Sequence, residues 1–168
     1  MASTHFNPNG DAHMVDVSGK AVTKRTASAI ASVSMSPQAR DLIQSGTAGK
    51  GDVLAVARLA AIMATKQTQH LIPLCHALPI ESVTVDFEFD AEPADAPKLH
   101  IRVTCETTYK TGIEMEAMTG ASIAALTVYD MLKSTDRSMQ IGPIRLERKT
   151  GGASGDHQFV YDEPPAQA

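Results

Sequence analysis

The segment Thr111–Lys133 most constrains the fold, because it reads as one long helix that is small or apolar almost all the way round. Its opposite side carries Asp130 together with Ile123 and Leu126. A helix with apolar residues on both sides is usually buried on both. At about 100° per residue, the more apolar side consists of Ile113, Ala121, Ala124, Ala125, Val128, Met131 and Leu132.

Two charged residues, Asp130 and Lys133, lie one turn apart on this helix. Burying a carboxylate and an amine costs desolvation energy, so the pair needs a reason to be there. An i,i+3 ion pair would contribute only about 0.2–0.5 kcal/mol, whereas a catalytic acid/base pair would give both residues a function. The helix alone leaves both interpretations open.

Composition bounds the class of protein. The 168 residues suit one domain over 1–168, with an ordered core over about 13–151 and polar, Pro/Gly-rich ends over 1–12 and 152–168 that we expect to be frayed. The net charge of −4, without a cluster of Lys and Arg, argues against nucleic acid as a partner.

Two further features bear on compartment. Cys75 and Cys105 have neither the spacing of a metal site nor the number needed for a disulfide framework. No apolar run reaches the roughly 20 residues that span a bilayer, and no signal peptide opens the chain, so we expect a cytoplasmic protein without a membrane partner.

Hydrophobic periodicity predicts the other elements, and Ser36-Pro37 and Asp52 are typical helix starts. We expect strands over 21–35, 80–90, 99–107 and 144–148, and helices over 37–44, 53–68 and 111–133. This order predicts an α+β fold, a ferredoxin-like α/β plait with the helices on one face of an antiparallel sheet.

Three loops carry side chains suited to ligands. Lys50 stands in a glycine-rich turn before a helix, but the spacing is not that of a Walker A loop. Cys75 and His76 lie between two prolines, and Lys149 precedes two glycines. Taken singly, each loop is more simply a structural turn.

Helix geometry adds a constraint on any site that uses both Glu116 and Asp130. The two side chains project about 40° apart but lie about 21 Å apart along the axis. If both touch one small substrate, one of them must come from a neighbouring subunit. The excess of apolar helix surface also suggests an obligate oligomer.

Six motifs in order from about residue 12 to 155 resemble the molybdenum cofactor biosynthesis protein C family, the cyclic pyranopterin monophosphate synthases. They are His13-Met-Val-Asp-Val-Ser18, Gly49-Lys-Gly-Asp52, Leu71-Ile-Pro-Leu-Cys-His76, Lys110-Thr-Gly-Ile-Glu-Met-Glu-Ala117, Tyr129-Asp-Met-Leu-Lys133 and Ile141-Gly-Pro-Ile-Arg-Leu146.

The resemblance implies a lyase that converts 3′,8-cyclo-7,8-dihydro-GTP, supplied by a radical enzyme, to cyclic pyranopterin monophosphate with release of pyrophosphate. It also implies ferredoxin-like subunits in a homohexamer, a trimer of dimers with sites between subunits. No carboxylate cluster marks a metal cage, so we expect no cofactor beyond Mg²⁺ that can accompany the triphosphate.

Carried over by motif, the resemblance assigns the acid/base pair to Asp130 and Lys133. Its substrate-binding residues are Leu74, Cys75, His76, Met115 and Glu116, and Lys50 and Lys149 are expected near the triphosphate. Two departures stand out. Tyr109 replaces a common glycine, and Ala153 replaces a common basic residue, which is expected to weaken phosphate binding slightly.

Two non-catalytic alternatives stay open at this point. Ferredoxin-like plaits also serve as ligand-binding or regulatory modules. A buried Asp130–Lys133 pair could instead fix the register of an assembly.

Overall fold

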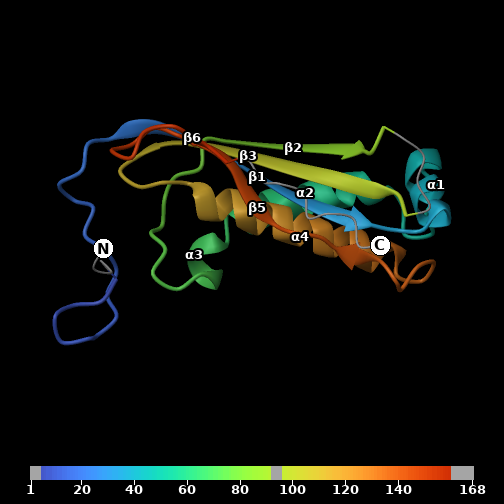
Figure 1. The fold of residues 1–168 in the computed structure, drawn as a ribbon, viewed down its shortest axis with the longest axis horizontal. Coiled ribbons are helices and arrows are strands. Elements are labelled where there is room, and N and C mark those ends of the chain that lie inside the picture. The colour runs from blue at the N-terminus through green and yellow to red at the C-terminus, as the bar shows by residue number, and fades with distance from the viewer. Residues whose placement is uncertain (1–4, 92–95, 160–168) are drawn as a thin grey trace.

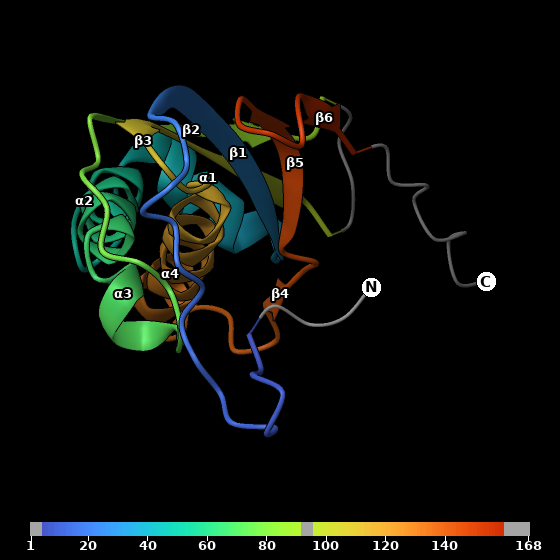
Figure 2. The same ribbon diagram turned by 90° about the vertical axis from the view of Figure 1, so that its left-hand side faces the viewer.

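The computed structural model describes residues 5–91 and 96–159. It places helices on one face of a six-stranded antiparallel sheet, as predicted (Figures 1 and 2). The element order is β1 (Thr23–Ser34), α1 (Pro37–Ser45), α2 (Val53–Thr65), α3 (Thr68–Leu71), β2 (Ser82–Phe89), β3 (Lys98–Tyr109), α4 (Glu114–Leu132), β4 (Gln140–Ile141), β5 (Arg145–Thr150) and β6 (His157–Gln158).

The strand order is β2-β3-β1-β5-β6, with β4 pairing to the end of β1. The two central strands are β1 and β3, which run antiparallel over the full length of β1. Crossovers through α1 and α2 and through α4 bring the strands into this order. The arrangement confirms the predicted ferredoxin-like plait.

Alternation along the central strands places one face in the core. Small residues on β1 meet larger ones on β3, as in the pairs Ala29 with Val103 and Val33 with Leu99. All four side chains are buried. Small side chains on β1 leave room for a helix to lie close above the sheet. The inward face of β1 and that of β3 therefore meet in the core.

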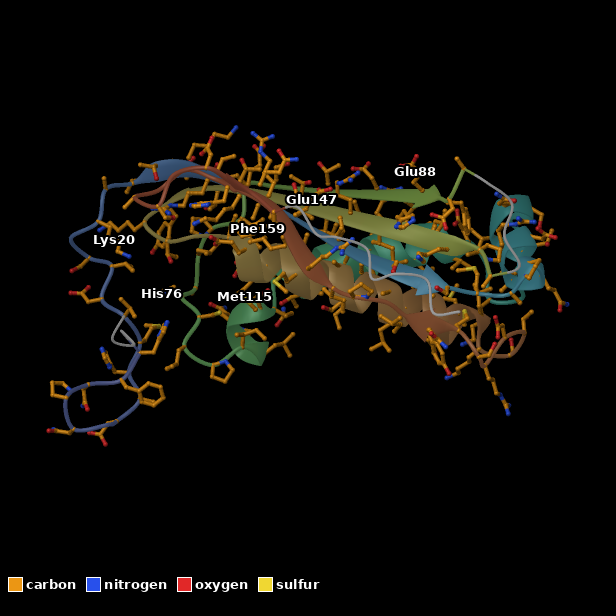
Figure 3. All side chains as sticks on the ribbon, viewed as in Figure 1. Lys20, His76, Glu88, Met115, Glu147 and Phe159 are labelled. Atoms are coloured by element: carbon orange, nitrogen blue, oxygen red, sulfur yellow. The ribbon has the colours of Figure 1, made fainter. Side chains whose placement is uncertain are left out.

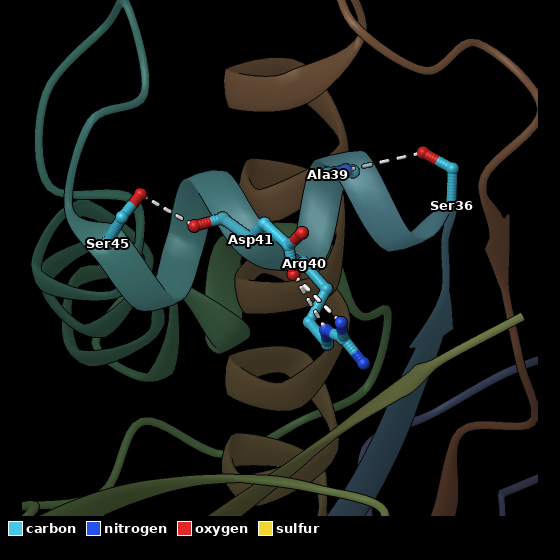
Figure 4. Close-up of polar contacts among 5 residues, drawn as sticks. All are labelled: Ser36, Ala39, Arg40, Asp41 and Ser45. Atoms are coloured by element: carbon cyan, nitrogen blue, oxygen red, sulfur yellow. Dashed lines mark hydrogen bonds and ion pairs between the residues drawn. The ribbon is translucent and has the colours of Figure 1, made fainter. Parts of the chain in front are cut away.

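Helix α1 begins and ends at the residues that its sequence marks. Ser36 is the N-cap, and its Oγ accepts a hydrogen bond from the Ala39 amide at 3.3 Å (Figure 4). Pro37 follows at the first helical position, where its missing N–H costs nothing. Gly46 ends the helix with φ of 68°, a left-handed conformation that glycine adopts without strain.

The predicted helix over 53–68 is two helices, α2 and α3, with a break at Lys66 and Gln67. The hydroxyls of Thr65 and Thr68 bond the carbonyls of Ile62 and Thr65, at 2.8 and 3.0 Å. Similar bonds from Ser122 and Thr127 lie within α4, which stays continuous, so these bonds accompany the break and do not by themselves explain it. The break turns the chain toward the loop that contains Cys75 and His76.

Helix α4 lies at the centre of the molecule, packed against α2 and against the sheet. It starts at Glu114, three residues later than predicted, because Thr111 and Gly112 belong to the loop after β3. Its inner face is fully buried, through Ala117, Ala121, Ala124, Ala125 and Val128.

The prediction that α4 is buried on both sides is wrong for the single chain. Leu126 is 53% exposed. The side chains of Asp130 and Lys133 are 55% and 53% exposed. Asp130 lies in the last turn of the helix and Lys133 at its C-cap.

Short strands and turns lie outside the predicted elements. β6 and a bridge between Phe6 and Ala12 lie beyond the range 13–151 predicted as the ordered core. Residues 1–4 and 160–168 of the expected frayed ends, and residues 92–95 of the β2–β3 connection, lie outside the described residues.

Gly120 is the position at which α4 meets both α2 and β3. A Cβ there would lie 2.9 Å from Thr65 Cγ2 and 3.0 Å from Val103 Cγ1. We expect Gly120→Val to lower the free energy of unfolding by about 1–3 kcal/mol, because overpacking forces these neighbours to move. Urea unfolding measures the change.

Thr127→Val is the matched control, since it replaces one hydroxyl at a partly exposed position of the same helix. It should alter stability by less than about 0.5 kcal/mol. Equal stability of Gly120→Val and the wild type would contradict the close helix contact.

Candidate active site

A cavity of about 350 Å³ lies at the N-terminal end of α4. The loop before β2 and the first turn of α4 form its walls. Figure 3 shows His76 and Met115 at this end of the molecule, with Lys20 nearby. The structure thus brings together five of the seven residues predicted to bind the substrate: Leu74, Cys75, His76, Met115 and Glu116.

The loop that supplies three of these residues has an unusual backbone. Leu74 has φ of 65°, in the left-handed region. That conformation is strained for a bulky residue and persists only where the surroundings fix it. Strain of this kind gathers at ligand sites, which supports a functional role for the loop.

Sequence reasoning missed the N-terminal segment as a cavity wall. Val15, Val17 and Lys20 line the cavity, and His76 Nε2 donates a hydrogen bond to the Val15 carbonyl at 2.7 Å. The signal was present, because His13–Ser18 is one of the six motifs. The motif alone does not predict that this segment lies against the cavity.

Glu116 is the buried acid of the site, with only 4% of its surface exposed. Burial, and then the charge of Glu114, raise its pKa to about 7. Burial and the charge of Glu116 likewise raise the pKa of the Cys75 thiol. Near neutral pH, Glu116 can therefore either donate or accept a proton.

A second cavity, of about 650 Å³, shares Lys20, Thr111, Gly112 and Glu114 with the first. Four cationic side chains line it, from the segment before β1, from β1, from the end of β3 and from β5: Lys20, Arg25, Lys110 and Lys149. Only Lys149 was predicted as a ligand residue. The other three come from segments that become neighbours through strand pairing.

Backbone geometry holds this cationic cavity in shape. Arg25 donates to the carbonyls of Tyr109 and Lys110, at 3.0 and 3.2 Å. Gly152 has φ of 77°, and a Cβ there would lie 2.2 Å from the Arg25 guanidinium. Gly152 therefore leaves room for the Arg25 side chain. On the same cavity, Lys149 Nζ lies 3.5 Å from a Glu114 carboxylate oxygen.

The predicted acid/base pair lies at the other end of α4. Lys133 Nζ is 2.6 Å from one Asp130 carboxylate oxygen, and Lys50 Nζ is 2.9 Å from the other. Hydrogen bonds from Lys133 and then Lys50 lower the pKa of Asp130 to about 2. Lys50 thus lies beside Asp130, away from Lys149.

Because α4 is continuous from Glu114 to Leu132, Glu116 and Asp130 of one chain are about 21 Å apart. We call the two groups the Glu116 cluster (Leu74, Cys75, His76, Met115 and Glu116) and the Asp130 cluster (Lys50, Asp130 and Lys133). A single small ligand on one chain reaches only one of them.

Two classes of site are not found among the described residues. No group of three or more His, Cys, Asp or Glu in residues 5–91 and 96–159 is arranged to hold a metal ion. Over the same residues, no helix has the length and apolar character needed to cross a membrane.

The raised pKa of Glu116 predicts a pH-dependent cost to folding. Below pH 4.5, its ordinary pKa, the Glu116 carboxyl is neutral and burying it does not lower the free energy of unfolding. Above about pH 7 the loss of stability is largest, since folding then buries a charge. From pH 4.5 to above pH 7, the stability of Glu116→Gln relative to the wild type should rise by on the order of 2–3 kcal/mol. Urea unfolding across this range measures the difference.

Glu88→Gln, at an exposed position of β2, is the control and should show a smaller change with pH. A difference between Glu116→Gln and the wild type that stays constant with pH would rule out a buried, titrating carboxyl.

Comparison with known proteins identifies relatives of this chain. The model of the MoaC family matches residues 14–152. A cyclic pyranopterin monophosphate synthase of Rhodopirellula baltica is 56% identical, covering 92% of this chain and 91% of its own. The synthase of Jannaschia sp. is 56% identical, with 96% of this chain and 98% of the relative covered. The synthase of Clostridium perfringens is 51% identical, with 93% of this chain and 97% of the relative covered. This chain belongs to the MoaC family.

Proposed function

We propose that this protein is a cyclic pyranopterin monophosphate synthase acting in molybdenum cofactor biosynthesis. Its substrate is 3′,8-cyclo-7,8-dihydro-GTP, and its products are cyclic pyranopterin monophosphate and pyrophosphate. The observation that carries the proposal is that two cavities share lining residues but differ in the chemistry of their side chains. One holds an imidazole and a buried acid, and the other holds four cations. A GTP-derived triphosphate likewise has a polar ring system joined to an anionic chain.

The cationic cavity suits the triphosphate. Closing the cyclic phosphate forms a new oxygen–phosphorus bond at the α-phosphorus and breaks the bond to the departing pyrophosphate, which makes the enzyme a phosphorus–oxygen lyase. Negative charge grows on the leaving group, and fixed cations lower the energy of that state. Lys20, Arg25, Lys110 and Lys149 supply such charges.

The Asp130 cluster suits proton transfer. Opening the reduced purine ring and building the pyranopterin moves protons between nitrogen, carbon and oxygen. With a pKa of about 2, Asp130 stays ionised at neutral pH and orients the ammonium groups of Lys133 and Lys50. We assign Lys133 as the proton carrier and Asp130 as the group that positions it.

The active site then combines two chains. The Glu116 cluster of one subunit and the Asp130 cluster of another meet around one substrate, in a homohexamer built as a trimer of dimers. Apolar side chains exposed on the single chain support an interface between subunits. They lie on α2 and α4: Val56, Leu59, Met63 and Leu126.

We propose no cofactor of the protein's own, with Mg²⁺ only as a companion of the triphosphate. We also propose a cytoplasmic location, where a GTP-derived substrate is formed.

Lys133→Ala tests the assigned chemistry. Purified protein is incubated with the cyclised GTP precursor, and pyrophosphate release and pterin fluorescence after oxidation are followed. We expect at least a hundredfold loss of turnover, the lower bound for removing a positioned proton donor, with assembly and ligand binding retained.

Lys24→Ala is the control, since the Lys24 side chain is 68% exposed and pairs with Glu106 on the open face of the sheet. A change of assembly in Lys133→Ala would favour a scaffold role for the pair. Absence of product from the wild type would favour a non-catalytic ligand-binding module.

Mixing two inactive variants tests the shared site. Glu116→Gln damages one cluster and Lys133→Ala the other. After dissociation and reassembly at equal amounts, about one quarter of the sites should combine an intact half from each chain, in a symmetric assembly. Turnover should return to about that level.

Reassembly of either variant with itself is the control and should restore nothing. Sedimentation of the active wild type as a monomer would exclude a site between subunits.

A further inference from the structure

The motif His13–Ser18 carries no catalytic group in the proposed function, yet it contacts the site at two points. The Val15 carbonyl accepts from His76 Nε2 at 2.7 Å. The Ser18 carbonyl accepts from Lys110 Nζ at 2.7 Å. His76 lines the Glu116 cavity and Lys110 the cationic cavity. The segment therefore contacts one lining residue of each cavity.

The chain turns between Val15 and Ser18, and the carboxylate of Asp16 shapes this turn. Asp16 accepts from the Ser18 amide at 2.7 Å and from the Ser18 hydroxyl at 3.0 Å. These bonds form an Asx turn, which fixes the direction of the neighbouring peptide groups. A further bond, from the Lys20 amide to the Val17 carbonyl at 3.1 Å, closes the segment.

The electrostatics agree with this placement. The pKa of the Asp16 carboxyl is lowered first by its hydrogen bonds from Ser18 and further by electrostatic interaction with Lys110 and His76. The carboxylate is itself exposed, so removing it leaves the core of the protein intact.

The contact from the Val15 carbonyl determines the protonation of the imidazole. A carbonyl oxygen only accepts hydrogen bonds, so Nε2 of His76 must carry its proton. Nδ1 is then the nitrogen that accepts a hydrogen bond or a proton when the ring is neutral. A fixed imidazole is worth more in catalysis than a rotating one, because small displacements cost large factors in rate.

From this geometry we propose that Asp16 is a positioning residue for the synthase reaction. Its turn with Ser18 aims the Val15 carbonyl at His76 and so holds the imidazole in one orientation and one tautomer within the cavity. The role of Asp16 in turnover rests on the proposed function, whereas its effect on the ring does not.

Asp16→Ala in the full-length protein tests the proposal with two independent measurements. At about pH 8, where an ordinary imidazole is neutral, the hydrogen-bonded Nε2–H proton of His76 should be observable by NMR in isotope-labelled wild type. In Asp16→Ala this resonance should be lost to solvent exchange. Turnover should fall about tenfold through kcat, with KM changed by less than about threefold.

Two variants make the result specific. Asp16→Asn keeps an oxygen that can accept from the Ser18 amide and should restore the resonance and most of kcat. Asp11→Ala is the control, because Asp11 accepts from Asn7 in the turn that precedes this segment. It should leave both measurements unchanged.

Persistence of the Nε2–H resonance in Asp16→Ala would overturn the proposal. So would loss of the resonance with kcat unchanged, or failure of Asp16→Asn to restore it. If the wild type makes no product, the proposed function fails, while the resonance still tests the effect of Asp16 on the ring.

Discussion

The structure depends on how closely α4 approaches the sheet and α2. The inner face of the helix is built from alanine, glycine and valine, and Gly120 lies where even one added carbon would meet Thr65 and Val103. Small side chains on β1 complete the fit. Close packing of this kind stabilises by many weak contacts, and it fixes the helix as a straight, rigid element.

That rigidity separates the chemistry into two places. The first turn of α4 carries Met115 and Glu116, and its last turn and C-cap carry Asp130 and Lys133. A continuous helix cannot bend the two ends together, so a single small ligand on one chain reaches only one cluster. The Asp130–Lys133 pair is exposed in the single chain, which fits our proposal that a neighbouring subunit covers it.

Much of the fold could be predicted from the sequence because its signals are local. Alternation along β1 and β3, the Ser36-Pro37 start of α1 and the apolar period of α4 each depend on residues close in the chain. The errors came at the ends of elements and where contacts between distant segments decided the outcome. The helix predicted over 53–68, for example, ends at Thr65.

The sequence by itself determined the long strands, the main helices and the family resemblance, since these follow from periodicity and from motifs in register. The same motifs named the residues of the Glu116 cluster. Only the tertiary structure decided that Lys20, Arg25 and Lys110 join Lys149, that Lys50 lies beside Asp130, and that Val15 contacts His76. Strand pairing and the return of the chain bring these residues together, and no local pattern predicts a contact between residues 61 or 80 positions apart.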